Sequence, residues 1–213
     1  MRRHGDASPA RLALALVMVS LAIGCARSVR LEPADARMAC RAGRVDDRTI
    51  GPEVEWWQPA GRAQRQRLDA WCATVGPAVI QRPAEHAALA TTVPVVDRLV
   101  VLTWNMHVGD GDLRRLVRDL RAGTLTGGRV PDGVVLLLQE ARRVGAEVPA
   151  VLASARDLHL VYAPGVRNCR GRGAAARDDR GSAIVSSLPL SRLQALELPL
   201  ERQRRVALGA TLT

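Results

Sequence analysis

Residues 99–140 read LVVLTWNMHVGDGDLRRLVRDLRAGTLTGGRVPDGVVLLLQE and predict a strand, a helix and a second strand. The apolar run over 99–104 ends at Asn105, and the run over 133–138 is closely followed by Glu140. Short apolar runs bounded by turn residues are typical of strands buried on both faces. Two such strands lying side by side would bring the amide and the carboxylate at their ends close together. Oxygen ligands of this kind suit Mg²⁺ or Mn²⁺.

The segment between the two runs predicts an amphipathic helix. Its apolar residues follow the spacing i, i+3, i+4, i+7 and are Leu113, Leu116, Val117 and Leu120. Asp110 or Asp112 can cap the start of this helix, and Gly123 can close its end. Glycines and a proline then turn the chain back into the second strand.

The motifs TWNMH and LLQE, in this order and in these contexts, resemble those of the endonuclease/exonuclease/phosphatase superfamily. That family includes deoxyribonuclease I-like nucleases, abasic-site endonucleases, inositol-phosphate phosphatases and neutral sphingomyelinases. Two later segments look like its following strands: RGSAIVSSLPL at 180–190 and RRVALGATL at 204–212. The resemblance covers 98–213. It implies an α/β (α+β) fold, a four-layer α/β/β/α sandwich of the deoxyribonuclease I-like type, incomplete at its C-terminus.

The resemblance also implies roles for individual residues. Glu140 would be the primary carboxylate ligand of Mg²⁺ (or Mn²⁺), and Asn105 an amide close to the metal or the phosphate. His107 stands where some relatives carry an acidic ligand and others a His, and we expect it to orient the site by a hydrogen bond. Arg180, at the end of an Arg-rich loop, and Arg205, where relatives often carry Arg, would contact the phosphate of the substrate.

Each of these residues also has a purely structural interpretation. Glu140 can form a strand-end salt bridge with Arg142 or Arg143. Asn105 can satisfy backbone groups in a turn. Arg205 can form an ion pair under the sheet, and the Arg-rich loop can be a solvated loop without a ligand.

The sequence departs from the family in two ways. Ser182 stands where relatives often carry Asn, and neither a Gly-Asp-x-Asn motif nor a Ser-Asp-His motif occurs in the chain. The family takes its general base and further catalytic residues from these motifs. We therefore expect the N-terminal portion of a longer hydrolase, weak or inactive on its own.

Composition favours an anionic partner. All 31 basic residues are Arg, and the formal net charge is +10. Such a charge attracts polyanions, so nucleic acid is the expected phosphodiester substrate. A sphingomyelinase-like lipid phosphodiesterase and a non-catalytic, polyanion-binding envelope lipoprotein remain as alternatives. No motif indicates a protein partner.

The N-terminus predicts export. Basic residues precede an apolar run that is too short for a comfortable transmembrane helix, so 1–24 is expected to be a signal peptide. Cys25 then resembles a bacterial lipoprotein cleavage site, where a lipid anchor would attach the protein to the membrane. The expected location is the bacterial envelope, periplasmic or at the cell surface; ordinary cleavage would instead give a secreted protein.

Export changes the interpretation of the remaining cysteines. In an oxidising compartment Cys40 and Cys72 are expected to form a disulfide, which leaves Cys169 over. Cys40 and Cys72 lie in 26–97, which we interpret as an N-terminal extension of the domain at 98–213. A helix is expected over 63–75 in this extension.

Overall fold

The computed structural model describes residues 29–35, 37–38, 40–45, 48–49, 53–83, 96–143, 157–167 and 178–213. The expected signal peptide at 1–24, the expected lipidation site Cys25, the spare Cys169 and most of the Arg-rich loop lie outside these residues. Residues 31–213 form one structural unit, which contains all the described strands and helices.

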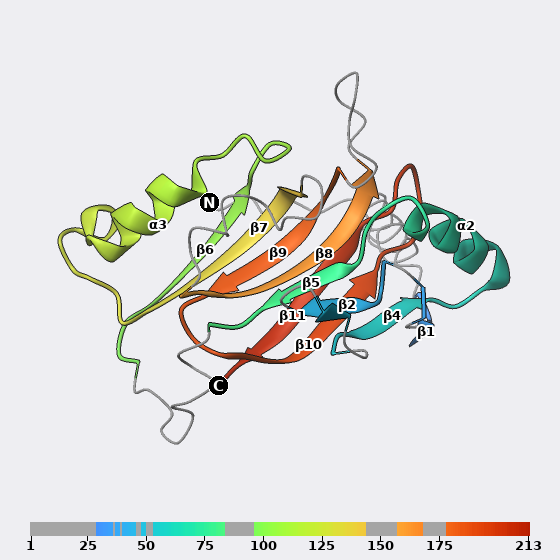
Figure 1. Ribbon diagram of the computed structural model, residues 1–213, viewed down its shortest axis with the longest axis horizontal. Coiled ribbons are helices and arrows are strands. Elements are labelled where there is room, and N and C mark those ends of the chain that lie inside the picture. The colour runs from blue at the N-terminus through green and yellow to red at the C-terminus, as the bar shows by residue number, and fades with distance from the viewer. Residues whose placement is uncertain are drawn as a thin grey trace, which may run out of the picture. The chain divides into compact units, whose positions relative to one another are not determined.

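Two mixed sheets make up most of this unit (Figure 1). The larger contains β2 (Gly43–Val45), β3 (Arg48–Thr49), β5 (Ala78–Gln81), β6 (Leu99–Asn105), β7 (Gly133–Arg143), β8 (His159–Arg167) and β9 (Asp179–Ser186), in the order β3-β2-β5-β8-β9-β7-β6. The smaller contains β1 (Leu31–Pro33), β4 (Glu55–Pro59), β10 (Leu190–Glu197) and β11 (Val206–Leu212), in the order β1-β4-β10-β11. The described helices are α2 (Arg62–Cys72), α3 (Leu113–Arg121) and a 3₁₀ turn at Thr124–Thr126. The fold is therefore rich in strand, with mixed sheets and few helices.

The strand–helix–strand prediction for 99–140 is confirmed, except that the second strand runs past Glu140 to Arg143. β6 and β7 pair in parallel, with Asn105 opposite Gln139, and α3 connects them. The Asp112 carboxylate caps α3 by accepting a hydrogen bond from the Arg115 backbone N–H at 2.9 Å. Gly123 follows the helix in the left-handed conformation, as expected for a helix-ending glycine.

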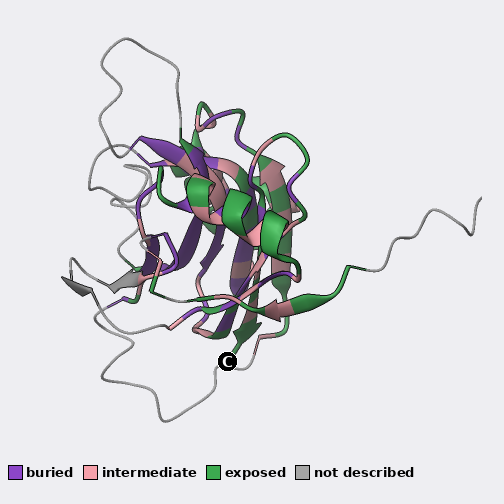
Figure 2. Ribbon diagram, turned by 90° about the vertical axis from the view of Figure 1, so that its right-hand side faces the viewer, coloured by how far each residue is buried: buried purple, intermediate pink, exposed green. Residues whose placement is uncertain are grey.

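The two larger apolar cores lie one on each face of the larger sheet. On one face α3 packs its buried Leu113 and Leu120 against strand residues such as Leu136 and Leu138. On the other face the two sheets pack together, through residues that include Val161 and Ala195. Buried residues gather in the strands in Figure 2, whereas the helix nearest the viewer is mostly exposed or half-buried.

The prediction that both organising strands are buried on both faces is wrong for β6. β6 is the edge strand of its sheet, and only its alternate residues, such as Leu102, pack under α3. Leu99 and Val101 on the opposite face are 42% and 58% exposed. The uninterrupted apolar run hid this difference, because a run without alternation carries no signal for a half-exposed strand.

The segment 26–97 is more than an extension. β4 pairs in parallel with β10, and β5 pairs antiparallel with β8, so this segment supplies strands to both sheets. The helix expected over 63–75 is α2. At the end of α2, Cys72 forms a disulfide with Cys40, the pairing expected from the sequence.

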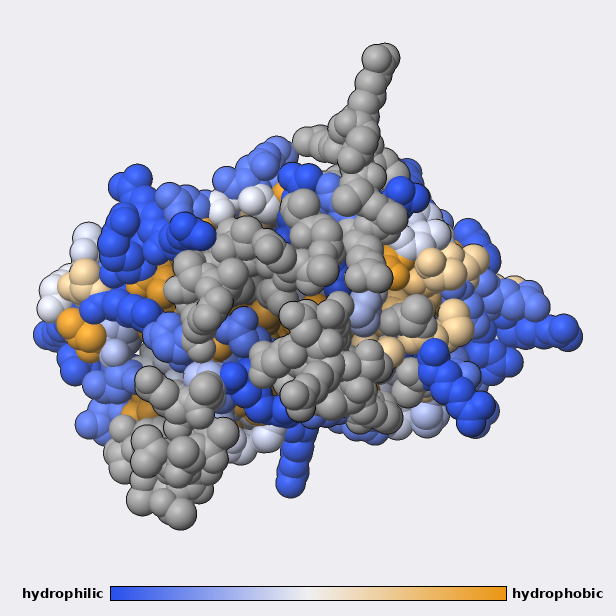
Figure 3. All heavy atoms as spheres, viewed as in Figure 1, coloured by the Kyte–Doolittle hydropathy of each residue, from blue (hydrophilic) through white to orange (hydrophobic). Residues whose placement is uncertain are grey.

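Hydrophilic residues dominate the face seen in Figure 3. Among the described residues, no helix has the length and apolar character needed to cross a bilayer.

Candidate active site

A cavity of about 370 Å³ lies where the pairing of β6 with β7 ends, at Asn105 and Gln139. Four of the residues singled out from the sequence line it: Asn105, Glu140, Arg180 and Arg205. Its other lining residues are Gln139, Gly165, Val166, Gly181, Ser182, Leu198, Gln203, Arg204 and Val206. The structure thus brings the amide, the carboxylate and two of the expected cations to one place.

Glu140 sits in a β-bulge. β7 pairs with β9 through Leu138 and again from Ala141, but two residues of β7 stand opposite Ser182 alone between these points. Glu140 takes the left-handed backbone conformation there, with φ of 53°. Bulges re-aim a side chain, and a left-handed residue other than glycine costs on the order of 1–3 kcal/mol. Here the bulge turns the Glu140 side chain into the cavity.

The loop after β6 is held by the two central residues. The Asn105 Oδ1 atom accepts a hydrogen bond from the His107 backbone N–H at 2.9 Å. The Glu140 Oε2 atom accepts one from the Val108 backbone N–H at 3.1 Å. His107, Val108 and Gly109 have φ of 49°, 64° and 83°, so the two side chains bind the first two of three consecutive residues with positive φ.

His107 contributes through its backbone. Its side chain is exposed and does not belong to the cavity lining, and the bond to Asn105 comes from its main-chain N–H. The hydrogen bond between His107 and the site is thus made by its main chain. Asn105 makes the hydrogen bond expected of a turn residue and also lines the cavity.

The alternative salt bridges of Glu140 are not formed. Arg142 makes a bidentate pair with Asp178, at 3.0 and 2.7 Å, and Arg143 pairs with the buried Asp179. The hydrogen bond that Arg142 donates to Asp178 raises the pKa of its guanidinium, and burial opposes this shift. The Arg180 Nη1 atom instead lies 3.9 Å from the Glu140 Oε2 atom. Glu140 is left facing the cavity and one arginine.

Two roles were considered for Arg205, contact with phosphate and an ion pair under the sheet. The structure divides them between Arg205 and its neighbour Arg204, which lie just before β11. Arg205 is exposed and lines the cavity, whereas Arg204 is fully buried and pairs with Glu197 at 2.9 Å. The ion pair under the sheet therefore belongs to Arg204. Period-two alternation with the buried Val206 and the half-buried Leu208 is the signal that could have found it.

The backbone at Gly181 lines the cavity and lies very close to the backbone of Ala163. A Cβ atom added at Gly181 would lie 1.9 Å from the Ala163 carbonyl oxygen, so only glycine fits there. The Ser182 hydroxyl donates to the Val206 carbonyl at 2.8 Å and joins the two sheets beneath the site. Ser182, which departs from the family pattern, is thus a structural link with a fixed partner.

The donor set for a metal ion is small. Within the described part of the chain, no group of three or more His, Cys, Asp or Glu side chains is placed to hold a metal. Glu140 is the one acidic side chain among the lining residues, with the Asn105 amide beside it in the lining. Mg²⁺ often uses only one or two carboxylates and keeps waters and substrate phosphates as its other ligands. These residues therefore suit Mg²⁺ better than an ion that needs a full protein cage.

A second cavity of about 210 Å³ lies beneath α3 and is lined mainly by apolar residues, among them Val117, Leu136 and Val185. Its charged residues already have partners, because Arg121 pairs with Asp157 and Asp132 with Arg98. It offers no converging polar groups and is not a candidate site.

Comparison of the chain with models of protein families, with curated proteins and with solved structures finds no match.

Proposed function

We propose that the cavity at the end of the β6–β7 pairing is the phosphate-binding part of a metal-dependent phosphodiesterase. The observation that carries this proposal is the convergence of Asn105, Glu140, Arg180 and Arg205 on one cavity. An acid that anchors a cation, next to two arginines, is the composition that a phosphodiester requires.

The metal would be Mg²⁺ or Mn²⁺, held by Glu140 with Asn105 beside it. When bound, the ion would neutralise negative charge on the phosphate. Arg180 and Arg205 would bind the non-bridging phosphate oxygens, and the bond from Val108 would keep the Glu140 carboxylate oriented. No imidazole lines the cavity among the described residues, so we expect slow hydrolysis by this chain.

Nucleic acid is the substrate that we propose, because the net charge of +10 favours a polyanion over a single headgroup. The fold that we propose in finer detail is a partial sandwich of the deoxyribonuclease I-like type. The parallel β6–α3–β7 unit and the two packed sheets support it. The buried Cys40–Cys72 disulfide supports export, because disulfides persist in oxidising compartments.

Binding of a fluorescein-labelled single-stranded DNA oligonucleotide tests the proposal. We expect Mg²⁺ to strengthen binding by the wild-type protein and to have no effect on Glu140→Gln, which keeps an oxygen for the Val108 N–H. Arg180→Ala and Arg205→Ala should each reduce the slope of log affinity against log salt by about 0.7, the value for one phosphate contact on a single strand.

Arg115→Ala is the matched control, because Arg115 is 71% exposed on α3, away from the cavity lining. Equal salt slopes for all three arginine variants would contradict the proposed site. Prolonged incubation with Mg²⁺ separates the alternatives: cleavage that disappears in Glu140→Gln supports the phosphodiesterase. Site-dependent binding without any cleavage would support the non-catalytic polyanion-binding protein.

A further inference from the structure

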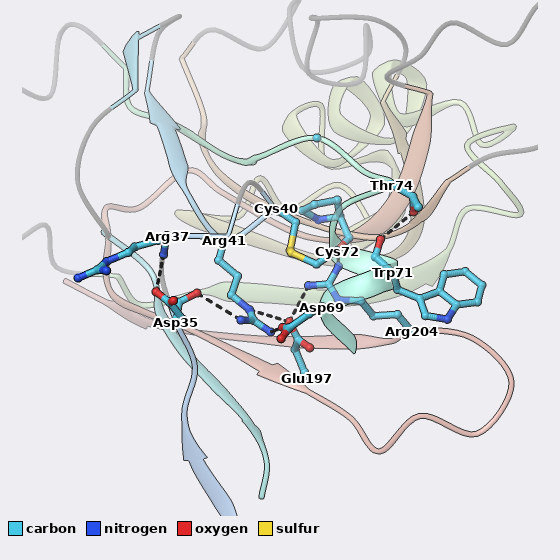
Figure 4. The surroundings of a disulfide bond; sticks show 12 residues. Asp35, Arg37, Cys40, Arg41, Asp69, Trp71, Cys72, Thr74, Glu197 and Arg204 are labelled. Atoms are coloured by element: carbon cyan, nitrogen blue, oxygen red, sulfur yellow. Dashed lines mark hydrogen bonds and ion pairs between the residues drawn. A yellow bond between two sulfur atoms is a disulfide. The ribbon is translucent and has the colours of Figure 1, made fainter. Parts of the chain in front are cut away.

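A fully buried ion-pair cluster of Arg41, Glu197 and Arg204 lies next to the candidate site (Figure 4). The Glu197 Oε1 atom accepts hydrogen bonds from Arg41 Nε at 3.0 Å and from Arg204 Nη2 at 2.9 Å. Two buried arginines thus share one carboxylate oxygen. Removing ions from water is costly, and the attraction within a buried ion-pair cluster often does no more than offset that cost.

One end of the cluster reaches the cavity. The Arg204 Nη1 atom donates to the carbonyl oxygens of Pro164 at 2.6 Å and Gly165 at 3.4 Å, and both Gly165 and Arg204 line the cavity. The Arg204 guanidinium also lies over the Trp56 ring, 5.7 Å from its centroid. Burial lowers the pKa of Arg204, and the charge of Glu197 opposes that shift. Glu197 therefore stabilises the charged form of the Arg204 side chain.

The same end fixes the connection between β10 and β11. The Leu198 backbone N–H donates to the Arg205 carbonyl at 3.0 Å and closes this connection, which contributes Gln203, Arg204 and Arg205 to the cavity lining. A Cβ atom added at Gly165 would lie 3.3 Å from the Arg180 carbonyl oxygen and 3.5 Å from that of Arg204. The backbones that carry the two phosphate-binding candidates, Arg180 and Arg205, therefore meet around Gly165.

The other end of the cluster is fixed by the disulfide. Arg41 follows Cys40, which is bonded to Cys72 at the end of α2. Arg41 also donates to the Gln58 side chain at 3.1 Å and to the Asp69 carboxylate at 3.2 Å. Each group that Arg41 contacts is part of β4, α2 or β10, or adjoins β1, so this arginine is held rigidly.

We propose that Arg204 is a positioning residue for the candidate site, held through Glu197 by the disulfide-anchored Arg41. Its role is to keep the connection 198–205 in place so that Arg205 faces the phosphate. The link to phosphate binding rests on the proposed function of Arg205. That Arg204 holds the connection 198–205 in place does not depend on it. A lysine at position 204 would keep the charge and lose the planar fork that reaches Glu197 and two carbonyls at once.

Hydrogen–deuterium exchange of Arg204→Lys tests the structural part. We expect faster exchange over 198–205, with β6 and β7 unchanged. Arg143→Lys is the matched control: Arg143 is also buried, and it contacts a carboxylate, a backbone carbonyl and an aromatic ring. It does not line the cavity, so its variant should leave 198–205 protected. Unchanged exchange over 198–205 in a folded Arg204→Lys protein would overturn the proposal.

A double-mutant cycle with the labelled oligonucleotide tests the link to the site. Arg204→Lys should weaken binding by about tenfold in the wild-type background, the effect of one charge-assisted hydrogen bond, and not at all in the Arg205→Ala background. Additive losses would overturn the link. Absence of oligonucleotide binding by the wild type would overturn the proposed function and the link together, while the exchange result would still decide the structural part.

Should Arg204→Lys fail to fold, Arg41→Lys provides the second variant. It leaves the contacts of Arg204 with Pro164 and Gly165 in place and removes the Arg41 fork, which binds Glu197 together with Gln58 and Asp69. Faster exchange over 198–205 in this variant supports the proposal, and unchanged exchange overturns it.

Discussion

The Glu140 carboxylate accepts a hydrogen bond from the backbone N–H of Val108, 32 residues earlier in the chain, at 3.1 Å. Both residues have left-handed backbone conformations, at φ of 53° and 64°. A β-branched residue such as Val108 rarely adopts this conformation. A residue of the loop after β6 and a residue of the β7 bulge, both with positive φ, are thus joined to each other, and Glu140 also lines the candidate site.

Gly109 should be the least replaceable residue of this loop. A Cβ atom there would lie 2.5 Å from the Arg142 Cβ atom, and its φ is 83°. Gly127→Ala is the control, because Gly127 also has positive φ but open space around it. Urea unfolding should show a loss of about 1–2 kcal/mol for Gly127→Ala from the backbone conformation alone. Gly109→Ala should cost at least about 1 kcal/mol more through overpacking, and equal losses would contradict the contact.

Asp112, rather than Asp110, should stabilise α3. The Asp112 side chain caps the helix, so Asp112→Ala is expected to lower the free energy of unfolding by about 0.5–2 kcal/mol. Asp110→Ala, at the exposed turn position that the sequence left equally open, should change it by less than about 0.5 kcal/mol. Chemical denaturation of both variants decides between the two residues; a larger loss for Asp110→Ala would reverse the assignment.

Much of this arrangement was predictable, for identifiable reasons. Two apolar runs predicted β6 and β7, and the apolar stripe between them predicted α3. The positions of Asn105 and Glu140 after these runs predicted that their side chains would lie close together. The bulge at Glu140 was not predictable, because it depends on pairing with β9 rather than on local sequence. The integration of 26–97 into both sheets was missed for the same reason: β4 and β5 find partners more than 75 residues away in sequence.

Removing the shared carboxylate of the buried cluster should be severe. Glu197→Gln leaves Arg41 and Arg204 buried without their common counter-charge, so we expect a loss of about 3–5 kcal/mol in the free energy of unfolding. Glu201→Gln is the control, because Glu201 is exposed in the adjoining connection. Thermal or urea unfolding of the pair measures the difference. Losses of the same size in both variants would mean that the cluster contributes no specific stabilisation.

Tyr162 offers a clean pH test because it is the one tyrosine in the sequence. Burial, then the neighbouring Asp179 charge, raises its pKa well above the ordinary value of 10.0. The native state therefore keeps the phenol proton at a pH where the unfolded chain loses it. Stability should then fall above pH 10 by about 1.4 kcal/mol per pH unit from this group.

Near-ultraviolet absorbance follows ionisation of this single phenol directly. Phenolate should form only together with unfolding, as monitored by circular dichroism. Ionisation of a fully folded protein near pH 10 would contradict the burial of Tyr162 and its hydrogen bond to Asp179.

A divalent-cation site at Glu140 and Asn105 is central to the proposed function. Titration of ¹⁵N-labelled protein with Mn²⁺, followed by paramagnetic broadening of amide signals, measures it without requiring catalysis. We predict that signals of Asn105, Glu140 and Ser182 broaden first, that Mg²⁺ competes, and that Glu140→Gln abolishes the effect. Broadening centred elsewhere, or broadening at the cavity that survives Glu140→Gln, would contradict the assignment.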